Sequence, residues 1–194
     1  TRHADHDGAS GMRVPWGVED EMRRRPPLNT HELAVIALDF RRAIEKARLK
    51  RHAKVMGRFP LGCCKHASQL LARYLVTELH VPLVSFVHGE RGGSSKSDPW
   101  QSHVWLSVNE HTLDITADQY EEIDSPVVVS VGSGWHSTWQ RQRRLTYGEM
   151  MTFDFWYGLR FRRMYSSILR AMNHQPALRV QFPLRNAGPP AELA

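Results

Sequence analysis

The sequence FPLGCCKHASQLLARYL, residues 59–75, contains both cysteines of this 194-residue chain and the start of an apolar helical pattern. Gly62, just before the cysteines, permits a close backbone turn. The spacing predicts a helix that begins at the cysteines and buries one side. The apolar residues of this side are Ala67, Leu70, Leu71, Tyr74, Leu75 and Leu79.

The remaining patterns predict an α+β domain. A helix is expected from Thr30, as its N-cap, to about Lys50, and a long amphipathic helix over residues 147–172. Strands are expected at VPLVSFVHG (81–89), HVWLSV (103–108), TLDITA (112–117) and SPVVVSVG (125–132). We therefore expect a cysteine-bearing helix packed on an antiparallel β-sheet, with extra helices at the N-terminal and C-terminal ends.

The expected organisation is one domain with two extensions. Residues 1–29 are expected to form a partly ordered arm, residues 30–183 a single catalytic domain and residues 184–194 a flexible tail. No apolar run is long enough for a membrane span. The first residues lack the apolar core of a signal peptide, so a cytoplasmic protein or a secreted effector are the two localisations we consider.

The net charge of +6 allows two classes of partner. The basic residues are spread over several clusters, and no nucleic-acid motif accompanies them, so a nucleic-acid partner is not expected. A basic binding module for an acidic protein or a nucleic acid remains the non-enzyme alternative. Oligomeric state is left open.

The two cysteines allow several kinds of chemistry. A disulfide between neighbouring residues is strained, and their spacing is not that of a zinc ligand pair. A thiol at a helix N-terminus, by contrast, is favoured as thiolate, particularly beside a histidine. A cysteine packed in the core is the ordinary alternative, because cysteine is among the most buried residue types.

His103 is the best-placed partner for such a thiol. It follows a polar loop (90–102), which we expect to border the same cleft, and it opens a strand. If Asn109 and Glu110 form a two-residue turn, Asp114 lies on the same sheet face as His103 and could orient its imidazole. Shifting the strand register by one residue would place Asp114 on the opposite face.

Residues 57–120 resemble the transglutaminase-like branch of the papain-like cysteine peptidase superfamily, of bacterial type. The resemblance rests on GCCKHASQLLARYL…VPLVSFVHG, on HVWLSV and on LDITAD. It implies a papain-like core with a Cys-His-Asp catalytic triad, and Gly62-x-Cys64 matches the Gly-x-Cys of the family. Cys63 remains the alternative nucleophile. The glutamine that the family carries upstream is absent from KVMGRF (54–59).

The resulting prediction is a cysteine-dependent acyl-transfer enzyme acting on a protein or peptide. Cys64 would attack the carbonyl carbon, His103 would act as base and then acid, and Asp114 would hold the ring. Hydrolysis of a peptide or isopeptide bond is the first choice, and glutamine deamidation or transglutamination the alternative. No cofactor and no metal are expected.

Other polar residues allow alternative assignments. Asp118 is the second candidate for the acid, and a metal site is the rival use of these side chains. Its candidate ligands are Cys63, Cys64, His66, His88 and His103. His136 has no identifiable partner in the sequence, and its neighbours Trp135 and Trp139 are expected in the core or along a cleft.

Overall fold

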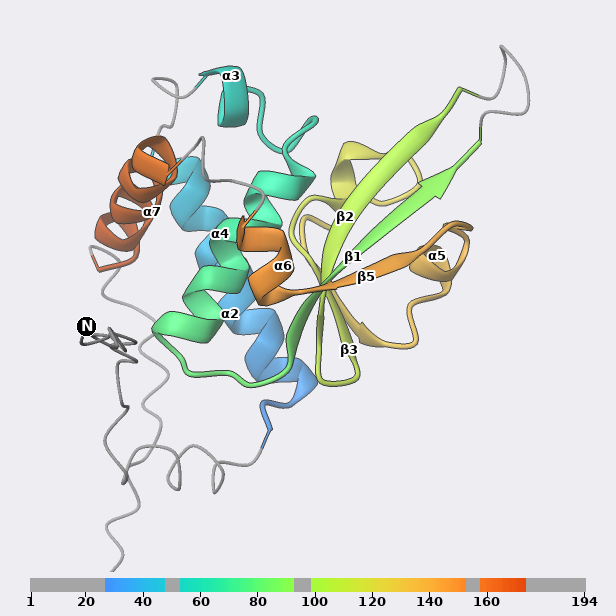
Figure 1. The fold of residues 1–194 in the computed structure, drawn as a ribbon, viewed down its shortest axis with the longest axis horizontal. Coiled ribbons are helices and arrows are strands. Elements are labelled where there is room, and N and C mark those ends of the chain that lie inside the picture. The colour runs from blue at the N-terminus through green and yellow to red at the C-terminus, as the bar shows by residue number, and fades with distance from the viewer. Residues whose placement is uncertain (1–26, 48–52, 93–98, 153–157, 174–194) are drawn as a thin grey trace, which may run out of the picture.

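The computed structural model describes residues 27–47, 53–92, 99–152 and 158–173 (Figure 1). The predicted arm, except for its last residues, lies outside this part of the chain, as do the predicted tail and residues 93–98 of the loop expected to border the cleft. Within the described part the predicted α+β class is confirmed. Helices pack on a five-stranded antiparallel sheet with the strand order β4-β3-β2-β1-β5.

The sheet is formed by five strands. They are β1 (Val84–Arg91), β2 (Gln101–Val108), β3 (His111–Asp114), β4 (Val128–Val131) and β5 (Arg143–Thr146). The short helices are η2 (Ala117–Gln119), between β3 and β4, and α5 (Gly134–Ser137), between β4 and β5.

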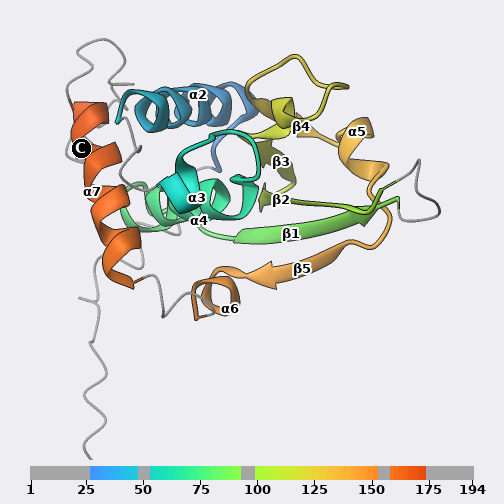
Figure 2. The same cartoon turned by 90° about the horizontal axis from the view of Figure 1, so that it is seen from above.

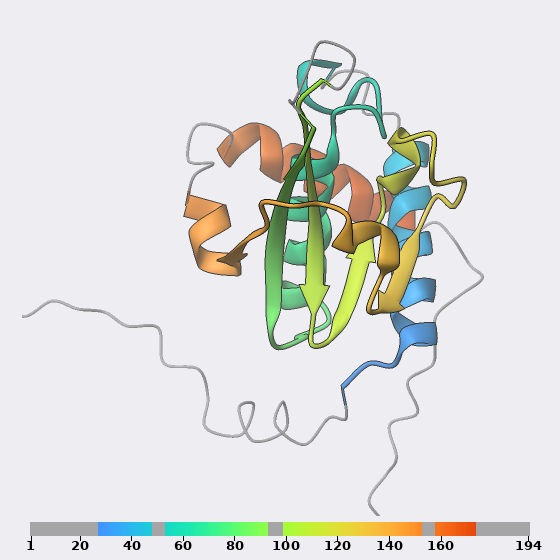
Figure 3. The ribbon, with the colours of Figure 1, turned by 90° about the vertical axis from the view of Figure 1, so that its right-hand side faces the viewer.

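The longer helices cover one face of this sheet (Figures 2 and 3). Helix α4 (Cys64–Thr77) contacts β1 and β2, and α2 (Thr30–Lys46) contacts β3 and β4. Helix α7 (Gly158–Asn173) packs on α2, while α3 (Ala53–Met56) adjoins α4 and α6 (Tyr147–Thr152) adjoins β5. The prediction that a helix begins at the cysteines is confirmed, because α4 starts at Cys64.

Two helix boundaries differ from prediction. The N-cap of α2 is Asn29 and not Thr30. The Asn29 side chain accepts a hydrogen bond from the Glu32 backbone N–H, and the Glu32 carboxylate accepts one from the Asn29 backbone N–H. The predicted helix over residues 147–172 is two helices, α6 and α7. In α7, Phe161, Met164 and Ile168 are buried in the main core.

The β2–β3 hairpin has the register that places His103 and Asp114 on one face. Leu106 pairs with Leu113 and Val108 with His111, around the two-residue turn at Asn109 and Glu110. Asn109 adopts a positive φ of 54°, which asparagine tolerates better than most residues. Continued by one pair, this register sets Trp105 opposite Asp114, as the alternation of strand residues predicts.

The two faces of β2 contribute to different cores. Val104, Leu106 and Val108 belong to the main core beneath the helices. Trp105 belongs to a smaller cluster on the opposite face, with Val87 and Trp139. Gly89 lies under this second cluster, where an added Cβ would come within 2.7 Å of the Trp105 ring. The second cluster surrounds the candidate site.

Candidate active site

Cys64 is the first residue of α4 and is partly exposed. The helix is fixed against β2 one turn later, where the Ser68 hydroxyl donates to the Val104 carbonyl at 3.1 Å. The backbone N–H groups of Val104 and Lys65 interact with the Cys64 sulfur. The thiol therefore lies beside the backbone of β2 at Val104 and contacts the ring of the preceding residue, His103.

Cys63 has a different environment from Cys64. It is 3 % exposed, belongs to the main core and donates its S–H to the carbonyls of Val55 and Leu61 at 3.3 and 3.4 Å. Burial raises the pKa of its thiol, and the neighbouring Cys64 raises it further. Cys63 is therefore held as a neutral thiol, which is the less nucleophilic form.

His103 and Asp114 form a buried pair on the face opposite to the long helices. The Nε2 atom of His103 lies 2.5 Å from Oδ2 of Asp114, and both side chains have 0 % exposure. Rings of the second cluster enclose the imidazole, with centroids between 5.2 and 5.7 Å from it. These rings are Trp105, Tyr120, Trp135 and Trp139. The expectation that Asp114 reaches one ring nitrogen of His103 is confirmed.

The electrostatics of the pair extend to Cys64. Burial lowers the pKa of His103, but the Asp114 carboxylate, followed by Cys64, raises it to about 9. Burial raises the pKa of Cys64, yet the hydrogen bond and charge of His103, with the backbone N–H groups, leave it below its usual range. Each group thus stabilises the charged form of the other, as in a thiolate–imidazolium pair.

Asp114 is held ionised by a full set of donors. Its Oδ1 accepts from the Thr116 backbone N–H at 2.8 Å and the Thr116 hydroxyl at 3.0 Å, while Oδ2 accepts from His103. Burial would raise the pKa of Asp114, but the charge and hydrogen bond of His103, followed by those of His136, hold it well below its usual range. The acid that orients His103 is therefore a carboxylate.

Asp118, the second candidate for the acid, has another role. Both of its carboxylate oxygens accept from the Arg41 guanidinium at 2.7 Å. This ion pair joins α2 to η2. Both carboxylate oxygens of Asp118 therefore bind Arg41 instead of His103. The sequence alone could not exclude Asp118, because its partner is distant along the chain.

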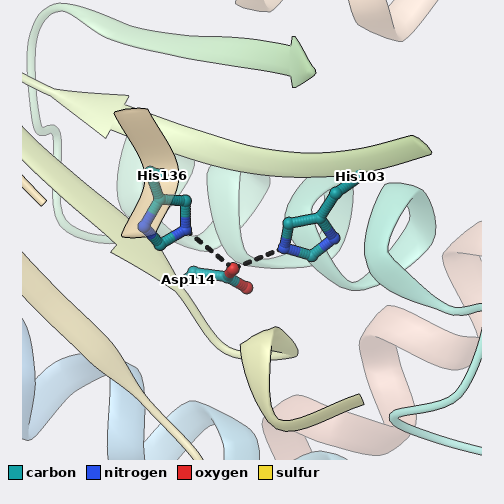
Figure 4. Close-up of side chains that lie close together, drawn as sticks. All are labelled: His103, Asp114 and His136. Atoms are coloured by element: carbon teal, nitrogen blue, oxygen red, sulfur yellow. Dashed lines mark hydrogen bonds and ion pairs between the residues drawn. The ribbon is translucent and has the colours of Figure 1, made fainter. Parts of the chain in front are cut away.

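His136 was not assigned a partner by sequence reasoning, and the structure places it on Asp114. Its Nε2 lies 3.0 Å from Oδ2 of Asp114, the same oxygen that His103 contacts. Figure 4 shows the two imidazoles on either side of the carboxylate. The residue is 3 % exposed and comes from the four-residue helix α5, which has no periodic pattern that could have predicted this position.

Gln119 is a second polar residue that sequence reasoning missed. Its Oε1 accepts from the Gly62 backbone N–H at 3.1 Å, and its Nε2 donates to the Thr116 carbonyl at 2.9 Å. The same Nε2 lies 3.2 Å from Nδ1 of His103. Gln119 therefore links the turn before α4 to the His103 nitrogen that is not bonded to Asp114.

The candidate metal ligands that the structure brings together differ from those proposed from the sequence. Among the described residues, His103, Asp114 and His136 have ligand atoms within 4.8 Å of one another. However, a carboxylate only accepts hydrogen bonds, so the two short contacts to Asp114 require protons on both Nε2 atoms. A metal ion needs those nitrogens deprotonated. The ligand set proposed from the sequence is not brought together, since Cys63 points to backbone carbonyls.

Comparisons with known proteins leave the geometry as the basis for assigning a function. The sequence matched no model of a protein family, no curated protein and no solved structure. In the part of the chain that the structure describes, no helix has the length and apolar character to cross a membrane.

Proposed function

We propose that this protein is a cysteine-dependent acyl-transfer enzyme with Cys64 as nucleophile, His103 as general acid and base, and Asp114 as the residue that orients His103. The observation that carries the proposal is the position of His103. One of its nitrogens is bonded to a buried carboxylate, and its ring stabilises the charged form of a partly exposed thiol. Such a thiol is activated by an adjacent base that a third group orients.

The proposed reaction begins with attack of the Cys64 thiolate on an amide carbonyl carbon. The His103 imidazolium then protonates the leaving nitrogen, the C–N bond breaks and an acyl thioester remains on Cys64. In hydrolysis, water attacks the thioester carbonyl carbon and His103 accepts a proton from the water. The C–S bond then breaks, which releases the carboxylic acid and restores the Cys64 thiolate and the His103 imidazolium. Peptide or isopeptide hydrolysis is our first choice, and attack on a glutamine side chain, followed by water or an amine, is the alternative.

Gln119 is proposed as an additional donor in this site. One of its side-chain N–H groups lies beside the reacting nitrogen of His103, which supports a role as donor to the oxyanion that develops during attack by Cys64. The finer fold assignment, a papain-like or transglutaminase-like core, is supported by the order of the three residues. The cysteine begins a helix, and the histidine and the aspartate lie on adjacent antiparallel strands.

The reactivity of the two thiols tests the proposal. We expect iodoacetamide to label Cys64 of the folded protein at pH 6 faster than it labels free cysteine, because the Cys64 pKa is lowered. Cys63 should stay unlabelled until the protein is denatured. Mass spectrometry of the Cys63→Ala and Cys64→Ala variants assigns each label to its residue.

Two further measurements complete this test. The His103→Gln variant should lose the fast labelling, since an amide cannot carry the positive charge that favours the thiolate. Labelling of both thiols only after denaturation would contradict the proposal. Incubation with a mixture of glutamine-containing peptides then distinguishes the reactions, because hydrolysis yields new termini and deamidation yields a glutamate in an intact peptide.

A further inference from the structure

His136 contacts the Asp114 carboxylate directly, yet the proposed reaction assigns it no role. Its Nε2 donates to Oδ2 of Asp114 at 3.0 Å. Its Nδ1 lies 2.7 Å from the hydroxyl of Ser133, which caps α5 by accepting the His136 backbone N–H at 3.4 Å. Both ring nitrogens are therefore engaged, and the ring is packed against Trp105 at 4.8 Å between centroids.

The hydrogen bonds of Asp114 show what the second histidine does to the carboxylate. Oδ1 is taken by the two Thr116 donors, so Oδ2 is the oxygen available to His103. His136 donates to that same oxygen from the other side. A carboxylate that accepts hydrogen bonds on several sides is fixed in orientation. Its negative charge is shared among these donors, so it stabilises the positive charge of each one less.

We propose that His136 is a positioning residue for the proposed acyl-transfer reaction: it holds Oδ2 of Asp114 toward His103 and limits how strongly the carboxylate stabilises the His103 imidazolium. This inference rests on the proposed function for its catalytic meaning. The hydrogen bond between His136 and Asp114 is present whether or not the protein is an enzyme.

The other titratable groups near His103 do not provide the same effect. They are Cys64 on α4, Tyr120 after η2 and Arg91 on β1. Arg91 is paired with Glu122 at 2.8 Å and lies over the Trp139 ring at 4.5 Å. Burial and then the Cys64 charge raise the pKa of Tyr120, so its hydroxyl is neutral. Among the described residues, His136 and Thr116 are thus the groups besides His103 that donate to Asp114.

The test is a titration of the His103 ring by nitrogen NMR on protein labelled with ¹⁵N-histidine. His136→Phe keeps a ring in place but removes its donor, so more of the carboxylate charge acts on His103. The midpoint of His103 should then rise by roughly one pH unit. His136→Gln, whose amide can donate to Asp114, should shift it less. His31→Gln, an exposed residue of α2, is the control and should leave it unchanged.

The outcomes separate this inference from the proposed function. An unchanged His103 midpoint in folded His136→Phe overturns the positioning role, even if Cys64 is labelled rapidly. Slow labelling of Cys64 in the wild-type protein overturns the proposed function, while the NMR midpoints still decide the role of His136.

The wild-type protein provides a test that does not depend on a folded variant. Its spectrum should show a proton on Nε2 of His136 that is protected from exchange, because this nitrogen donates to buried Asp114. Absence of that proton overturns the inference. Loss of both Nε2 protons on addition of zinc chloride also overturns it, in favour of a metal site.

Discussion

Asp114 provides the negative charge on which the proposed reactivity of Cys64 depends. Its carboxylate raises the His103 pKa, and His103 in turn lowers the Cys64 pKa. In Asp114→Asn the amide carries no charge, and its NH₂ group cannot accept from the two histidines. We expect labelling of Cys64 by iodoacetamide at pH 6 to slow by about tenfold or more, the equivalent of one pKa unit.

The matched control for this variant is Asp124→Asn, an exposed aspartate outside the site. Its labelling rate should equal that of the wild-type protein. A wild-type rate in folded Asp114→Asn would show that the carboxylate does not support the thiolate, and circular dichroism would establish that the variant is folded.

At the same scale, residue roles were predictable from sequence only where a pattern restricted them. Strand alternation allowed His103 and Asp114 on one face if Asn109 and Glu110 formed a two-residue turn, and the glycine before the cysteines marked the start of α4. Nothing in the local sequence distinguished Asp118 from a free acid or assigned His136 a partner. Both are decided by contacts with distant segments, Arg41 in one case and β3 in the other.

Among the elements, α2 is connected to the site by Arg41. The guanidinium donates to Asp118 and also to the carbonyls of Ile115 at 2.7 Å and Pro126 at 2.8 Å. It therefore fixes both sides of η2, which contains Gln119. Arg41→Met would leave Asp118 unpaired, and we expect a loss of about 3 kcal/mol in the free energy of unfolding, measured in urea.

The control for this prediction is Arg42→Met on the same helix. Arg42 is exposed and its pair with Asp39 is long, 3.9 Å, so the variant should lose less than about 1 kcal/mol. Equal losses in the two variants would refute a specific role for Arg41. Loss of fast Cys64 labelling in Arg41→Met, with the fold retained, would connect the η2 segment to the site.

Element types were predicted better than element ends. Apolar periodicity identified α4 and the strands β1 to β4, because their buried sides face the same core, whereas β5 was not predicted. The division between α6 and α7 was not predicted, because apolar residues recur throughout residues 147–172. The start of α2 was displaced by one residue, because the reciprocal bonds of Asn29 and Glu32 outweigh a cap by Thr30.

At the scale of the whole molecule, the buried ion pair of His103 and Asp114 should make the free energy of unfolding depend on pH. The Cys64→Ser background removes the thiol titration and leaves His103 and Asp114. Asp114 still raises the pKa of His103 in this background, so the pair contributes stability that is complete below the unfolded value of His103, near 6.5, and is lost as the pH rises through its raised folded value. The lowered pKa of Asp114 contributes stability that is complete above its unfolded value, about 3.9, and is lost at lower pH.

Unfolding in urea at pH 6, 8 and 10 measures this effect. The free energy of unfolding of Cys64→Ser should fall by roughly 1–3 kcal/mol between pH 6 and pH 10, because the folded state loses the His103 proton against the pull of Asp114. Adding Asp114→Asn should lower stability at pH 6 and flatten the alkaline decline. A decline of equal size in both proteins would assign it to groups outside the pair. The short contact between His103 and Asp114 would then not be an ion pair in solution.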